Sequence, residues 1–324
     1  MKSLRITFYC LMMLSVMVTL PRAQITYEFS GGRFGDCLMA YLHAKWLSYK
    51  HDIPLLYKPF EYSHQLVLDT AEPHFTGFTK PGTMVDKSVH VDARNECIYV
   101  VPYFSEVDYE RNLPWNSNWI YFPVDWQDQQ FKSMIQQLIA PKDPSVYQFS
   151  LPEGVITVAV HVRKGGGFDN PLLCDTQAVD PRTNLSQTFS DYYAPLKFPP
   201  EYFYTDALKR LVSLVGDSPI YVFIFTDDSR PHEIAARFEH ALSDYPQIRF
   251  DYRAQGNAHN ANVLHDFFAM TRFDCIIHPL SNFSLVASKL GTYRVQMYPT
   301  KHHWEGTTSV IDNVAVVVDG KEIL

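Results

Sequence analysis

The chain of 324 residues has few basic residues and few cysteines, and both shortages limit what it can do. Its 28 Lys and Arg are outnumbered by 35 Asp and Glu, so the net charge is −7. Broad nucleic-acid binding needs a basic face and is therefore excluded, although a single local anion site is compatible with this charge. Five cysteines without a C-x-x-C pair argue against a zinc ribbon or a thioredoxin-like centre. The P-loop, the G-x-G-x-x-G fingerprint and the G-x-S-x-G elbow are also missing.

What the sequence does contain is apolar and aromatic material. Hydrophobic residues make up 46% of the chain and aromatic residues 15%, while charged residues make up 19%. This composition excludes disorder and suffices for a large buried core. At about 150 residues per domain, the length predicts two domains.

The first 23 residues have the pattern of an export signal. Lys2 and Arg5 precede an uncharged apolar run over residues 6–20, and Pro21 follows it. The run is shorter than the ~20 residues of a comfortable membrane span. Three interpretations stay open: a cleaved signal peptide, an uncleaved signal-anchor that associates with a membrane through residues 6–20, and a helix of the folded core. The first two predict export or the secretory pathway, in the Golgi or endoplasmic reticulum lumen of a eukaryote, with the folded domain starting near Ile25.

Such a route permits disulfides and N-linked glycans. Asn184 and Asn282 each begin an Asn-x-Ser tripeptide, the acceptor pattern for N-glycosylation. Simple burial is an alternative to pairing for two of the cysteines, Cys37 and Cys275. The cysteines outside the signal are even in number and compatible with up to two disulfides: Cys37, Cys97, Cys174 and Cys275.

The second half of the chain alternates between apolar strand-like runs and helical periodicity. This alternation predicts an α/β fold with a doubly wound parallel sheet and right-handed crossovers. The predicted strands are 155–162, 220–225, 248–252, 275–278 and 295–298, and the predicted helices are 201–214, 231–242, 263–271 and 284–290.

The first half begins with a strand at 25–29, a glycine-rich turn and a helix from residue 37 onward, a unit whose helix N-terminus can receive an anion. A helix at 127–139 precedes a linker at 141–144, and no order is assigned within 59–125. We therefore predict two Rossmann-like domains that face a cleft, an N-terminal one over residues 25–144 and a C-terminal one over residues 150–324.

Ligands in doubly wound sheets bind at the carboxyl ends of the strands, and a basic cluster follows strand 155–162. Arg163 carries a planar guanidinium that matches two phosphate oxygens, and Lys164 adds a second charge. Glycines 165–167 would let backbone amides approach the same anion. The simpler interpretation is a strand end with ordinary surface basic residues. His161 is most simply a buried, hydrogen-bonded histidine, with a catalytic base as the alternative.

Two further polar clusters follow other strands. Asp227 and Asp228 come after strand 220–225, where paired carboxylates bind a cation, accept hydrogen bonds from a ribose or base, or cap the next helix. Ser281 and Ser284 lie at a strand-to-helix turn that forms either an anion pocket or a helix cap. Asp266 is a solvated or capping carboxylate unless its helix faces the cleft.

In this order, the clusters resemble the motifs of the fucosyltransferase superfamily, and most of all those of the alpha-1,2-fucosyltransferases. Residues 31–37 (GGRFGDC) resemble the family's Gly-Gly-Leu-Gly-Asn-Gln loop, and residues 161–166 (HVRKGG) resemble its His-x-Arg-Arg-Gly-Asp strand end. Residues 225–228 (FTDD) resemble Phe-Ser/Thr-Asp-Asp. Residues 266–270, followed by 281–284 (SNFS), resemble Asp-x-x-x-Met and Ser-x-Ser/Thr-Phe-Ser. The resemblance spans residues 25–298.

The chain departs from the family pattern at two points. Asp36 and Cys37 replace Asn-Gln in the first loop, and Gly166 replaces the Asp of the strand-end motif. The nearest acidic residue in that motif is Asp169, three positions later.

The resemblance implies a GT-B architecture, with the acceptor on the side of the N-terminal domain and the donor GDP-fucose held mainly by the C-terminal domain. It implies metal-independent, inverting transfer, with no metal or other cofactor. Arg163 would contact the donor pyrophosphate and stabilise the departing GDP, and Asp36 and Asp169 are the candidates for the base. The residues expected to bind the donor are Gly31, Gly32, Arg33, His161, Arg163, Lys164, Asp228, Asp266, Ser281 and Ser284.

The sequence thus predicts a glycosyltransferase that transfers fucose from GDP-fucose to a glycan hydroxyl and has no nucleic-acid partner. Two alternatives stay open. One is a non-catalytic protein that binds a nucleotide or a glycan on the same fold, and the other is a transferase that uses a different GDP-sugar.

Overall fold

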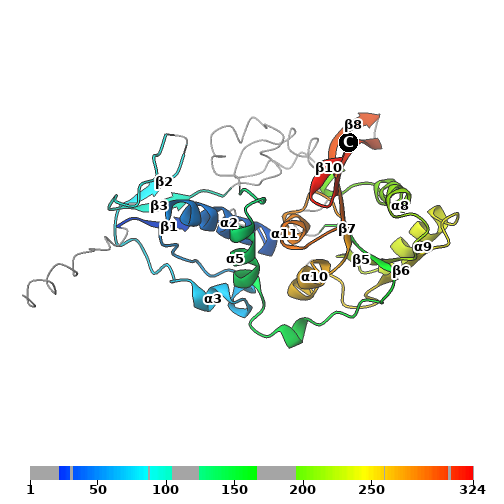
Figure 1. Cartoon of the computed structure of the whole chain (residues 1–324), viewed down its shortest axis with the longest axis horizontal. Coiled ribbons are helices and arrows are strands. Elements are labelled where there is room, and N and C mark those ends of the chain that lie inside the picture. Colours follow the sequence, from blue (N-terminus) through cyan, green and yellow to red (C-terminus); the bar gives the residue numbers. More distant parts are fainter. Residues whose placement is uncertain are drawn as a thin grey trace, which may run out of the picture.

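The computed structural model describes residues 22–29, 32–86, 88–103, 124–165, 195–258, 260–305 and 308–323. They form two α/β units, each built on its own sheet (Figure 1). Residues 1–21 of the predicted signal segment, one of the two N-x-S acceptors (Asn184) and two of the cysteines (Cys10 and Cys174) lie outside the described residues. None of the described helices has the length and apolarity needed to cross a bilayer.

The N-terminal unit contains a small parallel sheet with strand order β1-β3-β2. Isolated parallel bridges, Ile25 to Leu55 and Tyr57 to His74, continue the pairing on the side of β1. Just before β1, the amides of Arg22 and Ala23 both donate to the carbonyl of Ala93. The elements of this unit are β1 (Gln24–Tyr27), α2 (Phe34–His51), η1 (Ser63–Gln65), α3 (Leu68–Ala71), β2 (Gly82–Met84), β3 (Ile98–Val101), α5 (Gln129–Ile139) and η3 (Pro144–Tyr147).

The C-terminal unit contains a seven-stranded sheet with strand order β10-β9-β8-β7-β4-β5-β6. The strands from β8 to β6 are parallel, and β9 and β10 add an antiparallel edge. The elements are β4 (Ile156–Val162), α8 (Glu201–Val215), β5 (Ile220–Thr226), α9 (Pro231–Ala241), β6 (Ile248–Tyr252), α10 (Val263–Met270), β7 (Cys275–Ile277), α11 (Asn282–Leu290), β8 (Val295–Glu305), β9 (Thr308–Val318) and β10 (Lys321–Ile323).

The predicted α/β class with a parallel sheet is confirmed. Strand β4 is buried on both faces, as expected for a strand that reads as one continuous apolar run. The long hairpin of β8 and β9 was not predicted, since strand 295–298 is only the first third of β8. Its outer part contains consecutive polar residues, including His302 and His303, and lacks the apolar continuity of a buried strand.

Two hydrophobic clusters lie on opposite faces of the larger sheet. One packs α8 and α9 against alternate residues of β4 and β5, such as Val158 and Val222. The other lies on the opposite face and includes residues of α10, α11 and the N-terminal unit. Figure 1 shows α2 and α11 side by side between the two sheets. Phe34 of α2 meets Phe267 of α10 with ring centroids 5.3 Å apart, so the two units share one continuous core.

The described cysteines are thiols. Cys37, Cys97 and Cys275 are all free, so two disulfides among the four cysteines do not form. Burial raises the pKa of both Cys37 and Cys275 to about 12, which keeps these thiols protonated and poorly reactive at neutral pH.

Candidate functional site

The strand order of the larger sheet reverses between β4 and β7. After β4 the chain continues to β5 and β6 on one side of β4, and it then returns to form β7 and β8 on the other side. This position is the switch point of the sheet. Open α/β sheets bind ligands beyond the carboxyl ends of the strands at such a point. Arg163, Lys164 and Gly165 follow β4 directly, and residues 278–281 follow β7. Two of the three predicted polar clusters therefore meet at this crevice.

The turn after β4 is fixed by Asp227 from the end of β5. Its two carboxylate oxygens accept hydrogen bonds from the amides of Lys164 (2.7 Å) and Gly165 (3.1 Å). Gly165 has φ +90°, a conformation that favours glycine. The expectation that the Gly165 amide approaches an anion is therefore wrong, because Asp227 already occupies it. Residues 166, 167 and 169 lie outside the described residues, so the base role of Asp169 stays a prediction.

Arg163 bridges to the cluster after β7. Its Nη1 donates to Oγ of Ser281 at 2.6 Å, and its guanidinium lies over the ring of Phe198 with a distance of 5.7 Å to the ring centroid. Ser281 is the N-cap residue of α11 and is 1% exposed. The hydroxyl of Ser284 donates to the Ser281 carbonyl at 3.3 Å, so it stabilises the first turn of the helix. A guanidinium, a hydroxyl and the positive end of a helix dipole thus lie together at the switch point.

Two buried histidines lie on neighbouring strand ends. Val160 pairs with Ile277, so His161 and His278 are the next positions on β4 and β7. Burial lowers the pKa of His161 to about 3, with further lowering by Arg163 and His278. Burial likewise lowers the pKa of His278 to about 4. Both rings are neutral at neutral pH, and His161 is too weak a base to take a proton there, so its burial rather than its alternative role as base is supported.

The ring nitrogens of these histidines are only partly hydrogen-bonded. Nδ1 of His278 lies 2.9 Å from the Pro279 carbonyl and therefore carries the proton. Within the described part of the chain, Nε2 of His278 and Nδ1 of His161 are buried without a hydrogen-bond partner. His278 also stacks on Tyr298, with centroids 5.4 Å apart.

The first turn of α2 meets the first turn of α11 through Asp36. Its Oδ2 accepts from the Arg33 amide at 3.1 Å. Its Oδ1 accepts from the Tyr103 hydroxyl at 2.9 Å and from Nδ2 of Asn282 at 2.7 Å. Asp36 therefore links the two units and already accepts three hydrogen bonds, and its role as base stays a prediction. A glycan on Asn282 would break this link, which argues against that acceptor site.

The glycine-rich turn before α2 fits this contact. A Cβ on Gly32 would lie 2.3 Å from Oδ2 of Asp36, and one on Gly35 would lie 2.5 Å from the backbone nitrogen of Phe283. Both glycines allow a close approach that a larger residue would prevent. Gly31 lies outside the described residues.

Lys164 belongs to an ion-pair network rather than standing alone. Its Nζ lies 3.1 Å from Oε1 of Glu201, and Arg237 donates to both oxygens of the same carboxylate at 2.7 and 2.8 Å. Arg237 and Lys164 lower the pKa of Glu201. Arg237 also lies 3.8 Å from Oε2 of Glu233, so in this network two cations face two carboxylates.

Two predicted donor residues have structural partners. Oδ1 of Asp228 accepts from the Arg230 amide at 2.8 Å, a turn of three residues just before α9. The N-cap residue of α9 is Arg230, without a side-chain capping bond, so Asp228 does not cap this helix. Asp266 pairs with Arg253 at 2.5 Å. Burial raises the pKa of Asp266 while Arg253 opposes the shift, so Asp266 is a paired, buried carboxylate rather than a solvated one.

Several residues of the site carry no motif of their own in the sequence. Asp227 was seen only as one of a pair. Of the two side chains that donate to Asp36, Asn282 was seen only as a glycosylation acceptor within the 281–284 motif, and nothing marked Tyr103. Within the described residues, no three histidine, cysteine or acidic side chains form a group that could hold a metal ion. The residues missed are Tyr103, Phe198, Glu201, Arg237, His278 and Asn282.

No protein-family model and no curated protein matches the sequence. Solved structures do match. A mutant of Arabidopsis thaliana FUT1 in complex with GDP is 12% identical, with 92% of this chain and 74% of that chain covered and a TM-score of 0.52. The chain has the fold of a plant fucosyltransferase. Two further matches are the fucosyltransferase NodZ from Bradyrhizobium (13% identity, 92% and 99% covered, TM-score 0.48) and POFUT1 in complex with GDP-fucose (13% identity, 84% and 95% covered, TM-score 0.47). Together with the two sheets, the match to the FUT1 structure confirms the predicted GT-B-like class at the level of the fold.

Proposed function

We propose that the chain is a glycosyltransferase that transfers fucose from GDP-fucose to a glycan hydroxyl, with inversion and without a metal ion. The observation that carries the proposal is the contact of Arg163 with Ser281 at the switch point. It joins two motifs of the fucosyltransferase pattern that are 118 positions apart in the sequence. The order of the motifs favours the alpha-1,2 branch of the family.

In this reaction the acceptor oxygen bonds to the anomeric carbon of fucose, the bond from that carbon to the pyrophosphate breaks, and GDP leaves with the bonding electrons. Negative charge develops on the pyrophosphate as it departs. We expect Arg163 to share that charge through two parallel hydrogen bonds, and the contact with Ser281, which holds the guanidinium from one side, supports this role. The ammonium group of Lys164 and the N-terminus of α11 add to the same potential. Asp36 and Asp169 stay the candidate proton acceptors.

The two buried histidines are neutral, so they add no charge to the proposed anion site. Because His161 carries no charge at neutral pH, the positive charge beside the pyrophosphate is concentrated on Arg163.

We also propose that residues 1–23 direct the chain to the secretory pathway or out of the cell, and that residues 6–20 associate with the membrane if the segment is not cleaved.

A non-catalytic nucleotide- or glycan-binding protein is the second candidate. The observation that favours it is the engagement of Asp36, whose oxygens already accept bonds from three groups. A transferase for another GDP-sugar would keep the same pyrophosphate contacts and differ only in the sugar pocket.

The test compares GDP binding and GDP release. Binding is measured by calorimetry with and without EDTA, and release is measured from a panel of GDP-sugars with glycan acceptors. We expect binding that survives EDTA and release that is fastest with GDP-fucose. Binding without release from any donor would support the non-catalytic alternative, and preference for another donor would correct the sugar.

Arg163→Ala is the decisive variant. We expect it to reduce turnover roughly 10²–10³-fold, the effect of removing one preorganised donor, and to leave the melting temperature nearly unchanged. Arg163→Lys should restore little, because a point charge does not reproduce the guanidinium fork. The matched control is Arg272→Lys, since Arg272 donates to the Phe149 carbonyl away from this site. Unchanged GDP affinity and turnover in Arg163→Ala would refute the assignment.

A further inference from the structure

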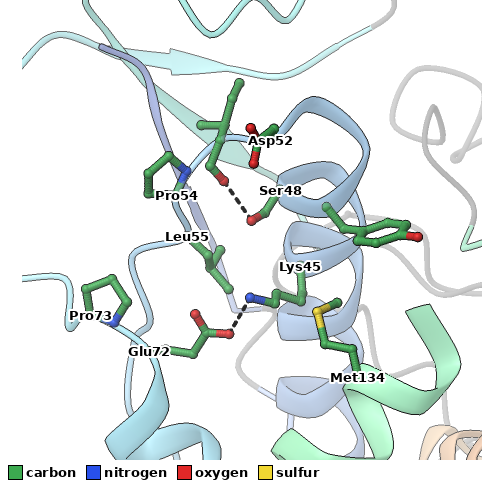
Figure 2. A pocket seen from close by; sticks show the side chains of 10 residues that line it. Lys45, Ser48, Asp52, Pro54, Leu55, Glu72, Pro73 and Met134 are labelled. Atoms are coloured by element: carbon green, nitrogen blue, oxygen red, sulfur yellow. Dashed lines mark hydrogen bonds and ion pairs between the residues drawn. The ribbon is translucent and has the colours of Figure 1, made fainter. Parts of the chain in front are cut away.

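A cavity of about 380 Å³ opens on the N-terminal unit, between α2, the segment after it and α5 (Figure 2). This volume lies in the lower range of small-molecule pockets. The proposed transfer chemistry makes no use of it. Its lining residues are Lys45, Ser48, Tyr49, Asp52, Ile53, Pro54, Leu55, Glu72, Pro73 and Met134.

A buried ion pair forms one side of the cavity. Figure 2 shows Lys45 and Glu72 reaching toward each other from α2 and from the end of α3. Nζ of Lys45 lies 2.6 Å from Oε1 of Glu72, and the side chains are 15% and 6% exposed. Removing both charges from water costs more than a well-packed apolar pair would, so stability alone is a weak reason for their presence.

The pair leaves one acceptor available to a ligand. The hydroxyl of Tyr41 also donates to Oε1 of Glu72, at 3.1 Å, so both donors use the same oxygen. Neither of these contacts involves Oε2 of Glu72. Because Lys45 and Tyr41 hold Oε1, the carboxylate group is fixed in position. Its second oxygen, Oε2, can then accept a hydrogen bond from a hydroxyl or an N–H group of a ligand.

The rest of the lining is also rich in acceptors. Asp52, in a left-handed conformation at the end of α2, adds a second carboxylate at the opposite end of the cavity from Glu72 (Figure 2). Oγ of Ser48 donates to the Ile53 carbonyl at 2.7 Å and keeps its lone pairs for a further donor. One cation against two carboxylates makes an anionic ligand unfavourable, especially because Lys45 is already paired.

The remaining walls are apolar and come from Pro54, Leu55, Pro73 and Met134. A pyranose ring matches this combination, because it presents hydroxyl donors at its edge and C–H groups on its faces. We propose that the cavity binds a neutral carbohydrate residue.

The proposed sugar site is separate from the transfer site. Lys45 lies nine residues after Asp36 on α2, which is about 13 Å along the axis and half a turn around it. The two residues therefore face opposite sides of the helix. The proposal does not depend on the transfer reaction, and its failure would leave the proposed function untouched.

The experiment uses the folded chain with GDP added in excess, so that the nucleotide crevice is not available to the probes. The probes are the methyl glycosides of glucose, galactose, mannose and N-acetylglucosamine at millimolar concentration, with putrescine as a cationic probe and glucuronate as an anionic one. Binding is measured by saturation-transfer NMR and by calorimetry. We expect at least one neutral glycoside to bind and both charged probes to bind more weakly.

Two variants locate the binding. Met134→Trp fills the cavity and should abolish binding of the glycoside, whereas the matched control Met134→Leu keeps the volume and should bind as the wild type does. Glu72→Gln keeps the shape and should weaken binding about tenfold, the cost of losing a charged acceptor. If Met134→Trp fails to fold, Glu72→Gln decides.

The proposal is overturned if no neutral glycoside binds, if Glu72→Gln and a folded Met134→Trp bind as the wild type does, or if putrescine or glucuronate binds more tightly than every glycoside.

Discussion

At Gly35 the backbone of α2 lies against the first turn of α11, and replacing this glycine with alanine tests the contact between the two units directly. A Cβ at this position would lie 2.5 Å from the nitrogen and 2.7 Å from Cα of Phe283, and 2.9 Å from the carbonyl carbon of Asn282. All three are backbone atoms, so no change of rotamer relieves the contact. Helices α2 and α11 must therefore separate by roughly 1 Å to reach ordinary contact distances.

The cost of this separation can be estimated from the bonds beside it. Overpacking of this kind costs about 1–3 kcal/mol. A shift of ~1 Å also takes the 2.7 Å bond from Asn282 to Asp36 beyond hydrogen-bonding distance, which costs about 1.5–3 kcal/mol for a charged acceptor. Alanine returns about 1 kcal/mol through its helix propensity. We expect Gly35→Ala to lower the free energy of unfolding by about 1.5–5 kcal/mol.

The assay is urea denaturation together with GDP calorimetry on Gly35→Ala and on a matched control, Gly82→Ala. The methyl group at Gly82 would meet the ring of Phe78, a side chain that is 58% exposed and free to rotate away. The control should therefore be near wild type in both measurements. Gly35→Ala should also bind GDP more weakly, because α11 carries Ser281, the partner of Arg163. A stability equal to that of Gly82→Ala would refute the close contact between the helices.

Two further predictions concern pH and follow from the shifted pKa values. Because the pKa of Glu201 is lowered, mainly by Arg237, its stabilising effect is present above the unfolded value of about 4.3 and is lost as the pH falls through the folded value. Thermal melts should show Glu201→Gln less stable than wild type at pH 7, with the difference closing in acid; an equal difference at both pH values would contradict this. Unfolded histidine binds a proton near pH 6.5, but His161 and His278 resist protonation until about pH 3 and 4, so the free energy of unfolding should fall as the pH drops below 6.5. His278→Phe, which keeps a ring against Tyr298, should make this fall shallower, whereas an unchanged slope would show that His278 does not contribute.

The strands and helices of the second half could be predicted because their sequence patterns lie within short, continuous segments. Residues 155–162 are buried on both faces and form one apolar run, while the helix at 201–214 shows a 3.6-residue period that reflects one buried face. These patterns gave the order of strands and helices, and hence the strand ends that hold Arg163 and Ser281. The first half was harder, since α2 is buried on most sides and lacks a clear polar face.

The sequence by itself determined the α/β class, the parallel sheet and the residue types at its carboxyl edge. It could do so because burial and helical or strand periodicity produce patterns among residues that are close together in the sequence. Only the tertiary structure decided what those side chains touch. It assigned Asp227 to the turn after β4, Glu201 to Lys164 and Asp36 to Asn282, pairings between residues 37 to 246 positions apart. It also brought Glu72 to Lys45 at the cavity. Such contacts depend on how helices and strands pack in space, and no local pattern along the chain encodes which distant residue will arrive at a given strand end.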